Sequence, residues 1–99
     1  MDIKITQHEK ILIIMLRDFK ANGGAWFRAS DFQREHYGLF IGYEATARMS
    51  ELVKQVPFIF ETRQNGRFRE VKLKIDGIKE KIERLPASLA RHFYLENFL

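Results

Sequence analysis

The chain has 99 residues, of which 45% are hydrophobic and 30% charged, with a net charge of +4 and no cysteine. A chain of this length cannot fill two hydrophobic cores, and its composition is not that of a disordered protein, so we expect one globular domain. The lack of cysteine excludes a disulfide framework, a thiolate metal site and a catalytic thiol. Since the longest apolar run, residues 11–16, is too short to cross a bilayer and no signal-peptide pattern is present, we expect a soluble, cytoplasmic protein.

The first predicted element is a helix that begins after Thr6. Thr6 and Glu9 have the spacing of a capping box, in which the hydroxyl and the carboxylate each accept a hydrogen bond from a backbone N–H. Apolar residues then recur at helical spacing on one face, namely Ile11, Leu12, Met15, Leu16 and Phe19. The Asn-Gly-Gly sequence at residues 22–24 ends the helix.

Two short elements are predicted next. The aromatic stretch at residues 25–28 lies between a glycine turn and a new cap, which is typical of one short strand. Ser30 and Gln33 repeat the capping-box spacing, so we expect a short second helix that ends near Tyr37. Gly38 is then expected in the left-handed conformation that often follows a helix.

After an apolar connection at residues 39–42, a third helix is predicted over residues 43–55. Its apolar residues fall on one side, namely Ala45, Met49, Leu52 and Val53, and the opposite side carries Tyr43, Ala47, Ser50, Glu51 and Lys54. Pro57 ends this helix, because the residue before a proline is driven towards an extended conformation.

A β-hairpin is predicted over residues 58–75. Residues 58–63 are rich in β-formers, and residues 68–75 alternate between apolar and polar, with one break at Arg69 and Glu70 that is typical of a β-bulge. Between them, Asn65 and Gly66 are a strong signal for a tight turn, because both residue types tolerate positive φ.

The hairpin carries most of the chain's positive charge. Five basic and two acidic residues lie between positions 61 and 75, an excess of three in a chain whose total is +4. Such a local excess indicates a surface that binds a polyanion. The alternative is an ordinary solvated strand face, on which lysine and arginine discourage edge-to-edge pairing.

The last part of the chain, residues 77–99, is interpreted as a helical extension of a domain that spans residues 1–76. A short amphipathic helix at residues 78–85 ends at Pro86, and a final helix carries Leu89, Phe93, Leu95, Phe98 and Leu99. So many apolar residues need a partner surface. Either they pair with a second copy in a homodimer, or they pack back on the first helix as part of the core.

The order of these elements over residues 5–76 resembles the winged-helix superfamily of helix-turn-helix DNA-binding proteins. The resemblance lies in the sequence of helix, short strand, helix, turn, helix and hairpin. It implies an α+β fold with three helices, a two- to three-stranded β-hairpin wing and a C-terminal helical tail. In that family the third helix, here residues 43–55, enters the major groove, and the wing, here residues 58–75, lies along the backbone or the minor groove.

The resemblance also implies which side chains contact DNA. On the helix they are Tyr43, Thr46, Ala47, Arg48, Ser50 and Lys54, and on the wing Arg63, Gln64, Asn65, Arg67 and Arg69. The guanidinium of Arg48 has the donors to read guanine, and the arginines of the wing suit phosphates. Arg28 and Arg34 are expected to add backbone contacts. Glu44 and Glu51 oppose indiscriminate phosphate binding and so favour a sequence preference, unless they serve only solubility.

These residues predict a protein that binds double-stranded DNA with a sequence preference, as a transcriptional regulator, and a homodimer would match two half-sites. The alternative is a winged-helix protein–protein interaction module in a larger assembly, and RNA is a third candidate partner. His8, His36 and His92 are isolated from one another, and no nucleophile motif or close acid–base pair occurs. We therefore expect no metal, no cofactor and no enzymatic activity, and no small-molecule effector is evident.

Overall fold

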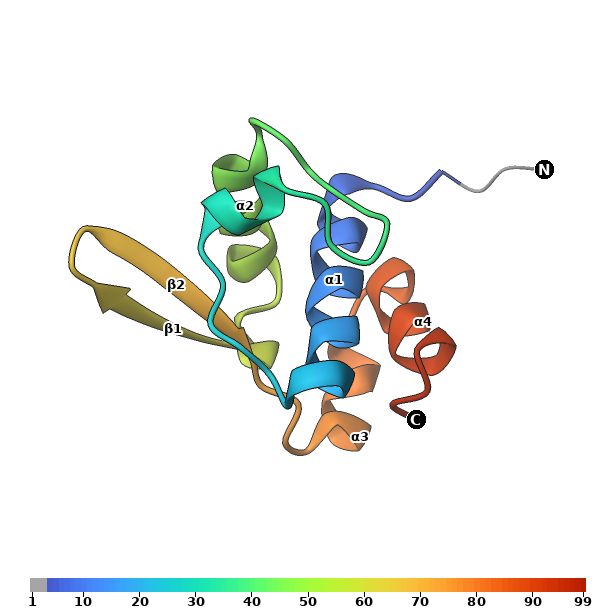
Figure 1. Cartoon of the computed structure of the whole chain (residues 1–99). Coiled ribbons are helices and arrows are strands. Elements are labelled where there is room, and N and C mark those ends of the chain that lie inside the picture. The colour runs from blue at the N-terminus through green and yellow to red at the C-terminus, as the bar shows by residue number, and fades with distance from the viewer. Residues whose placement is uncertain (1–3) are drawn as a thin grey trace.

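Helix α1 (Gln7–Asn22) runs through the middle of the computed structural model, which describes residues 4–99 (Figure 1). The hairpin and helix α2 (Ala45–Gln55) lie on one side of α1, and helix α4 (Ala87–Leu95) lies on the other. The predicted cap is confirmed, since the Glu9 N–H donates to Thr6 Oγ1 (3.2 Å) and the Thr6 N–H donates to Glu9 Oε2 (2.9 Å). Six consecutive residues, 11–16, are buried, so α1 is covered on several sides and not on one apolar face alone.

The remaining elements make an α+β arrangement. The 3-10 helix η1 (Ala29–Gln33) precedes α2, and a second one, η2 (Pro57–Ile59), links α2 to strands β1 (Phe60–Asn65) and β2 (Phe68–Leu73). Helix α3 (Ile78–Lys81) and the 3-10 helix η3 (Ile82–Arg84) lead to α4. Compared with the prediction, α2 begins two residues later and leaves Tyr43 outside the helix, and the hairpin begins at Phe60 because the residues before it form η2.

The predicted second helix, from Ser30 to Tyr37, is wrong. The structure has only the five-residue η1 there. Asp31 takes the role expected of Gln33, that of the residue whose side chain bonds back to the start of the helix, because the backbone N–H of Arg28 donates to Asp31 Oδ2 (2.7 Å). At Arg34 the backbone is already extended, with φ −108° and ψ 160°, so the helical hydrogen bonds stop after this turn.

Residues 36–39 form a tight turn instead. His36 and Leu39 exchange two backbone hydrogen bonds of 2.8 and 2.9 Å. Tyr37 (φ 53°) and Gly38 (φ 80°) occupy the corner, and positive φ at both corner residues is the type I′ pattern. Gly38 therefore has the left-handed conformation predicted for it, but it serves this turn and not the end of a helix.

The hairpin is confirmed, and its register is regular. β1 and β2 pair residue for residue over all six positions, so the expected bulge at Arg69 and Glu70 is wrong. The two-residue loop consists of Gly66 and Arg67, and Asn65, predicted to lie in the turn, is the last residue of β1. Gly66 has φ 63°, and glycine at the first of two loop positions is the type II′ pattern, which needs positive φ at that residue alone.

The predicted short strand at residues 25–28 is reduced to one β-bridge. Phe27 and Val71 exchange two backbone hydrogen bonds of 2.7 and 2.8 Å, so this segment lies beside β2 as a minimal third strand. Successive side chains of an extended segment point to opposite faces. Phe27 is accordingly buried in the core, while Trp26 and Arg28 contact side chains on the outer face of the hairpin.

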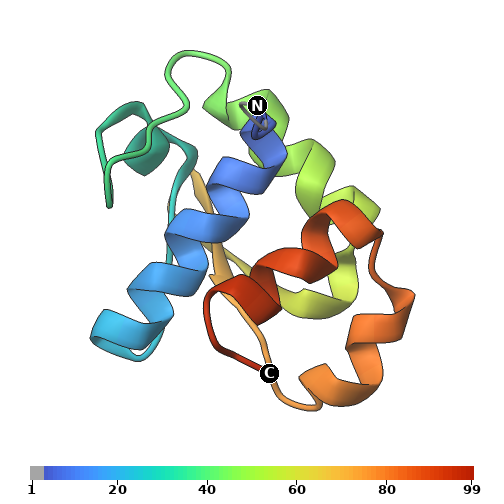
Figure 2. The same cartoon turned by 90° about the vertical axis from the view of Figure 1, so that its right-hand side faces the viewer.

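The C-terminal segment packs back on α1. Leu89 and Phe93 of α4 are buried in the same core cluster as residues of α1, α2 and both strands, and α4 lies beside α1 in Figure 2. Of the two arrangements that the sequence left open, the structure has the one in which residues 77–99 complete the core. Leu89 and Phe93 are therefore not free to pair with a second copy, whereas Tyr94 and Leu95 are exposed.

A buried carboxylate joins α1 to α4. Glu9 Oε1 lies 2.5 Å from Arg91 Nη2 and 2.9 Å from His92 Nε2, and Oε2 accepts the hydrogen bond from the Thr6 N–H. Burial acts to raise the pKa of Glu9, but the hydrogen bonds from Thr6, His92 and Arg91 outweigh it and lower the pKa from 4.5 to about 2. The charged form of Glu9 therefore stabilises the fold.

We expect Glu9→Gln to lower the free energy of unfolding at neutral pH by at most about 3 kcal/mol, because a pKa shift on folding is also a stability difference. Since the pKa of Glu9 is lower in the folded chain, its contribution is complete above pH 4.5 and is lost as the pH falls towards 2. Urea denaturation at a series of pH values should show the stabilities of wild type and variant converging in acid. Glu83→Gln, at an exposed position of η3, is the control. A constant difference down to pH 2 would contradict this role of Glu9.

Candidate nucleic-acid interface

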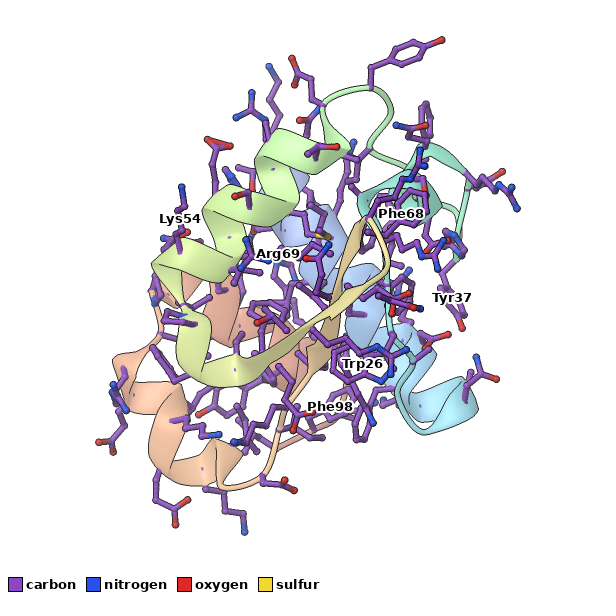
Figure 3. All side chains as sticks on the ribbon, turned by 90° about the vertical axis from the view of Figure 1, so that its left-hand side faces the viewer. Trp26, Tyr37, Lys54, Phe68, Arg69 and Phe98 are labelled. Carbon is purple, nitrogen blue, oxygen red and sulfur yellow. The ribbon has the colours of Figure 1, made fainter. Side chains whose placement is uncertain are left out.

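A groove of about 410 Å³ lies between α2, η1 and the hairpin. Met49 and Val53 of α2 and Val71 of β2, all buried, contribute its apolar base. Polar side chains from all three walls surround this base, namely Arg28, Ser30, Gln33, Thr46, Ser50, Arg67 and Arg69. In Figure 3, which faces this side of the molecule, Arg69 lies between the hairpin and α2. The structure thus brings predicted residues of the helix and of the hairpin to one place.

Helix α2 presents three surfaces to its surroundings. Thr46 and Ser50 line the groove. Ala47 and Lys54 are exposed on the outer side of the helix, and Lys54 points away from the hairpin in Figure 3. Arg48 lies on the third side, next to α1, where it contacts Gln7. The rotation of about 100° per residue separates it from the neighbouring Ala47 on the outer side.

Arg48 is held by acidic neighbours on that third side. Its Nη1 lies 2.5 Å from Glu51 Oε1, its Nη2 lies 3.3 Å from Glu44 Oε2, and its Nε donates to Gln7 of α1 (3.1 Å). The hydrogen bond with Glu51 raises the pKa of Arg48 and lowers the pKa of Glu51, and His8 of α1 lies 3.3 Å from the same carboxylate. Both acids are therefore paired with one guanidinium away from the groove, and the residue predicted to read guanine is already engaged.

Arg67 and Arg69 are the cations that the hairpin places at the groove. Within residues 4–99 neither forms an ion pair, and the same holds for Lys54 of α2. Gln64 pairs with Arg69 across the hairpin and donates to the carbonyl oxygen of Gly66 (3.1 Å). The three cations are therefore available to an anionic partner.

Arg63 and Asn65 lie on the outer face of the hairpin, where both bind Glu70. Glu70 is only 5% exposed, and it accepts hydrogen bonds from Arg63 Nε (2.7 Å), Arg28 Nε (2.9 Å) and Asn65 Nδ2 (3.3 Å). The hydrogen bond from Arg63, followed by that from Arg28, lowers the pKa of Glu70. Arg63 and Asn65 are therefore engaged within the protein and do not line the groove.

Two aromatic rings flank this site. The guanidinium carbon of Arg63 lies 4.2 Å from the centre of the Trp26 ring, and that of Arg28 lies 4.4 Å from the centre of the Phe68 ring. Cation–π contacts at this range add to the ion pairs. We call the six residues Trp26, Arg28, Arg63, Asn65, Phe68 and Glu70 the Glu70 cluster. Because Trp26 and Arg28 belong to the segment before η1, the Glu70 cluster fixes the hairpin to the body of the protein.

Sequence reasoning missed the Glu70 cluster, although a signal for it exists. A loop at Gly66 and Arg67 places Arg63 directly opposite Glu70, since each is three positions from the loop. The predicted turn lies one residue earlier and would place Arg63 opposite Phe68. Sequence reasoning also missed the groove wall made by η1, because its residues were expected to begin a longer helix.

Two further predicted residues, Tyr43 and Arg34, lie outside the groove. Tyr43 is 99% exposed just before α2, and Phe40, which was not predicted, is 58% exposed in the preceding loop. With Gln33 and Gly42 they border a second hollow of about 300 Å³. Arg34 is exposed at the end of η1.

No protein-family model matches the chain, and neither a curated protein nor a solved structure is significantly similar to it. None of the helices in residues 4–99 is long and apolar enough to span a membrane. In that same part of the chain, no three histidine, aspartate or glutamate side chains are grouped so as to hold a metal ion. The geometry of the described residues therefore has to carry any functional proposal.

We expect Glu70→Ala to loosen the hairpin, because it leaves the guanidinium groups of Arg28 and Arg63 without their buried partner. Hydrogen exchange of the backbone N–H groups in β1 and β2 should become faster, and the fluorescence of Trp26, the single tryptophan, should change. Glu61→Ala removes an exposed glutamate from the same hairpin and should leave both signals nearly as they are. Equal exchange rates in the two variants would count against anchoring by the Glu70 cluster.

Proposed function

We propose that this chain binds double-stranded DNA as a sequence-preferring transcriptional regulator of the winged-helix type, with α2 as the recognition helix and the hairpin as the wing. The observation that carries the proposal is that Arg67, Arg69 and Lys54 are exposed around α2 and form no ion pair within residues 4–99. Cations that are not neutralised within the protein attract a polyanion and gain affinity by displacing its counterions.

The order of the elements supports the winged-helix interpretation. Helix α1, η1, α2 and the hairpin follow one another as the resemblance implies, and the segment around Phe27 lies beside β2 in the place of the small additional strand. The chain departs from the pattern at the second helix, which is a single 3-10 turn. Helix α4 lies on the far side of α1 and leaves α2 and the hairpin uncovered (Figure 1).

Helix α2 has a surface suited to the major groove, which admits an α-helix whose side chains reach the base edges. Ala47 is exposed and has no bulk to hold α2 away from DNA. Thr46 and Ser50 offer hydroxyl groups that donate to or accept from bases and phosphates. The pairing of Arg48 with Glu44 and Glu51 reduces the repulsion that these acids would exert on phosphates.

Arg48 has a secondary role in this proposal. To reach a guanine it has to exchange its bonds to Glu44 and Glu51 for bonds to the base, which offsets part of the energy gained. Thr46 and Ser50, which already face the groove between α2 and the hairpin, are therefore the first candidates for base contact.

The hairpin would supply the contacts to the DNA backbone. Arg67 lies in its turn and Arg69 lies two residues further along, both on the groove side. Contacts of this kind give affinity and register while base edges give specificity. Arg63 and Asn65, also predicted to contact DNA, would act indirectly by holding the hairpin through the Glu70 cluster.

A protein–protein interaction module is the second candidate, and one observation favours it. Phe40 and Tyr43 are both exposed and border the same hollow ahead of α2. Aromatic residues are enriched in protein–protein interfaces relative to the rest of the surface. A protein partner at this place would leave Arg67 and Arg69 unused.

Arg67→Ala and Arg69→Ala should each weaken binding to every duplex by a similar factor, because phosphate contacts do not depend on sequence. Each should also reduce the slope of log affinity against log salt by about one, as expected when a single phosphate is no longer neutralised. Fluorescence anisotropy with labelled duplexes at several salt concentrations measures both effects. Lys79→Ala, an exposed lysine of α3, has the same change of charge and should alter neither. Unchanged slopes in both arginine variants would remove the hairpin from the interface.

Ala47→Glu should abolish duplex binding while the melting temperature stays close to that of wild type, because it places a carboxylate against DNA from an exposed position. Selection from random duplexes identifies the preferred site for this assay. Ala87→Glu makes the same change at the exposed start of α4 and should bind normally. Duplex binding by folded Ala47→Glu protein at the wild-type level would take α2 out of the major groove and favour the interaction module.

A further inference from the structure

We propose that the groove between α2, η1 and the hairpin is also a binding site for a small organic anion with an apolar body, such as an aryl or alkyl carboxylate. Such a ligand would compete with DNA and so regulate the proposed function. The competition rests on the proposed function, whereas binding of the anion itself does not.

The size and enclosure of the groove suit a small molecule. Its volume of about 410 Å³ falls in the range of about 300–1,000 Å³ that is usual for ligand pockets. Three elements form its walls, and they are held in place independently of any ligand. The hairpin is fixed by the Glu70 cluster, and α2 is fixed by its buried residues on α1.

The base of the groove is apolar. Met49, Val53 and Val71 reach it from the core, and Ala29 and Phe68 complete the apolar lining. The Phe68 side chain is 46% exposed although it stacks on Arg28, so part of its surface is open to solvent. An aromatic or aliphatic body placed here would be removed from water, which is the main source of affinity for such groups.

The rim of the groove selects an anion. No aspartate or glutamate is among the residues that line it, while Arg67 and Arg69 are, and neither arginine has an ionic partner within residues 4–99. A guanidinium group binds a carboxylate through two parallel hydrogen bonds. The hydroxyl groups of Ser30, Thr46 and Ser50 stand on the opposite walls and can donate to the same group.

The third lining arginine has a different role. Arg28 is bonded to Glu70, which it shares with Arg63, so its charge is partly balanced and it attracts a further anion less than a free arginine does. The positive charge at the rim therefore comes mainly from the tip of the hairpin. Since Arg67 and Arg69 are also the residues proposed to hold DNA phosphates, a bound carboxylate and a bound duplex exclude one another.

The test uses the full chain and the probe 4-phenylbutyrate, with the neutral 4-phenylbutan-1-ol as matched control. Titration followed by amide chemical shifts, without DNA, should give saturable shifts at α2, η1 and the hairpin tip at concentrations up to the millimolar range. The alcohol should bind about tenfold more weakly or worse, as expected for loss of a charge-assisted pair. In the anisotropy assay, 4-phenylbutyrate should displace the duplex and the alcohol should not.

Two variants locate the site. Arg69→Ala should weaken 4-phenylbutyrate at least about tenfold and bring it close to the alcohol. Ser50→Phe fills the groove from a half-buried position and should abolish the binding of both compounds while the protein still melts cooperatively. Lys79→Ala, outside the groove, should bind the probe like wild type.

The outcomes separate the two proposals. Absence of saturable shifts at the groove, equal affinity for acid and alcohol, or unchanged binding in Arg69→Ala would overturn the anion site even if duplex binding is found. Binding of 4-phenylbutyrate at the groove by a chain that does not bind duplex DNA would support the anion site and overturn the proposed function with its competition.

Discussion

The need to cover α1 on all sides organises the rest of the structure. Residues 11–16 form an unbroken apolar run, and a helix cannot turn six consecutive side chains to one surface, because they spread around its whole circumference. Helix α2, strand β2 and helix α4 each cover a part of α1. The hairpin and α2 are thereby brought to the same side, and the groove between them follows from this arrangement.

Local signals in the sequence are enough to predict those helices and the hairpin whose ends are set by a cap, a proline or a glycine. The capping box at Thr6 and Glu9, the proline after α2 and the glycine of the hairpin loop each act within four residues of the chain. Prediction fails where two local signals compete. At the second helix both Asp31 and Gln33 can bond back to the start of a helix, and in the structure Asp31 does so, in an element that is only five residues long.

Other features depend on contacts between distant residues, and sequence periodicity does not report these. Glu70 has the pattern of a solvent-facing strand residue, yet its partner Arg28 is 42 positions away and buries it. The direction in which α4 packs is open in the sequence for the same reason, since its apolar face fits a second copy as well as α1. Helix α2 is predicted almost correctly, and the pairing of Arg48 with Glu44 and Glu51 has the i,i+4 and i,i+3 spacing of a local signal that the prediction did not use.

The charge pattern of the candidate interface is a consequence of this packing. Acidic side chains near α2 are paired on the side of α1, and the acid of the hairpin is paired on its outer face. The groove between α2 and the hairpin is therefore lined by arginines and hydroxyl groups that have no acidic neighbour in the lining. A chain with a modest net charge of +4 can in this way present a groove whose lining holds arginines without an ionic partner within residues 4–99 and no acidic residue.

The bond between Glu9 and Arg91 joins two residues that are 82 positions apart in the chain. A ribosome delivers α1 well before α4, so the apolar run of α1 remains incompletely covered until α4 has emerged. Folding of this domain is therefore expected to be completed only once α4 is available, rather than element by element as the chain emerges. A nascent chain that lacks α4 would present part of the apolar surface of α1 to chaperones and proteases.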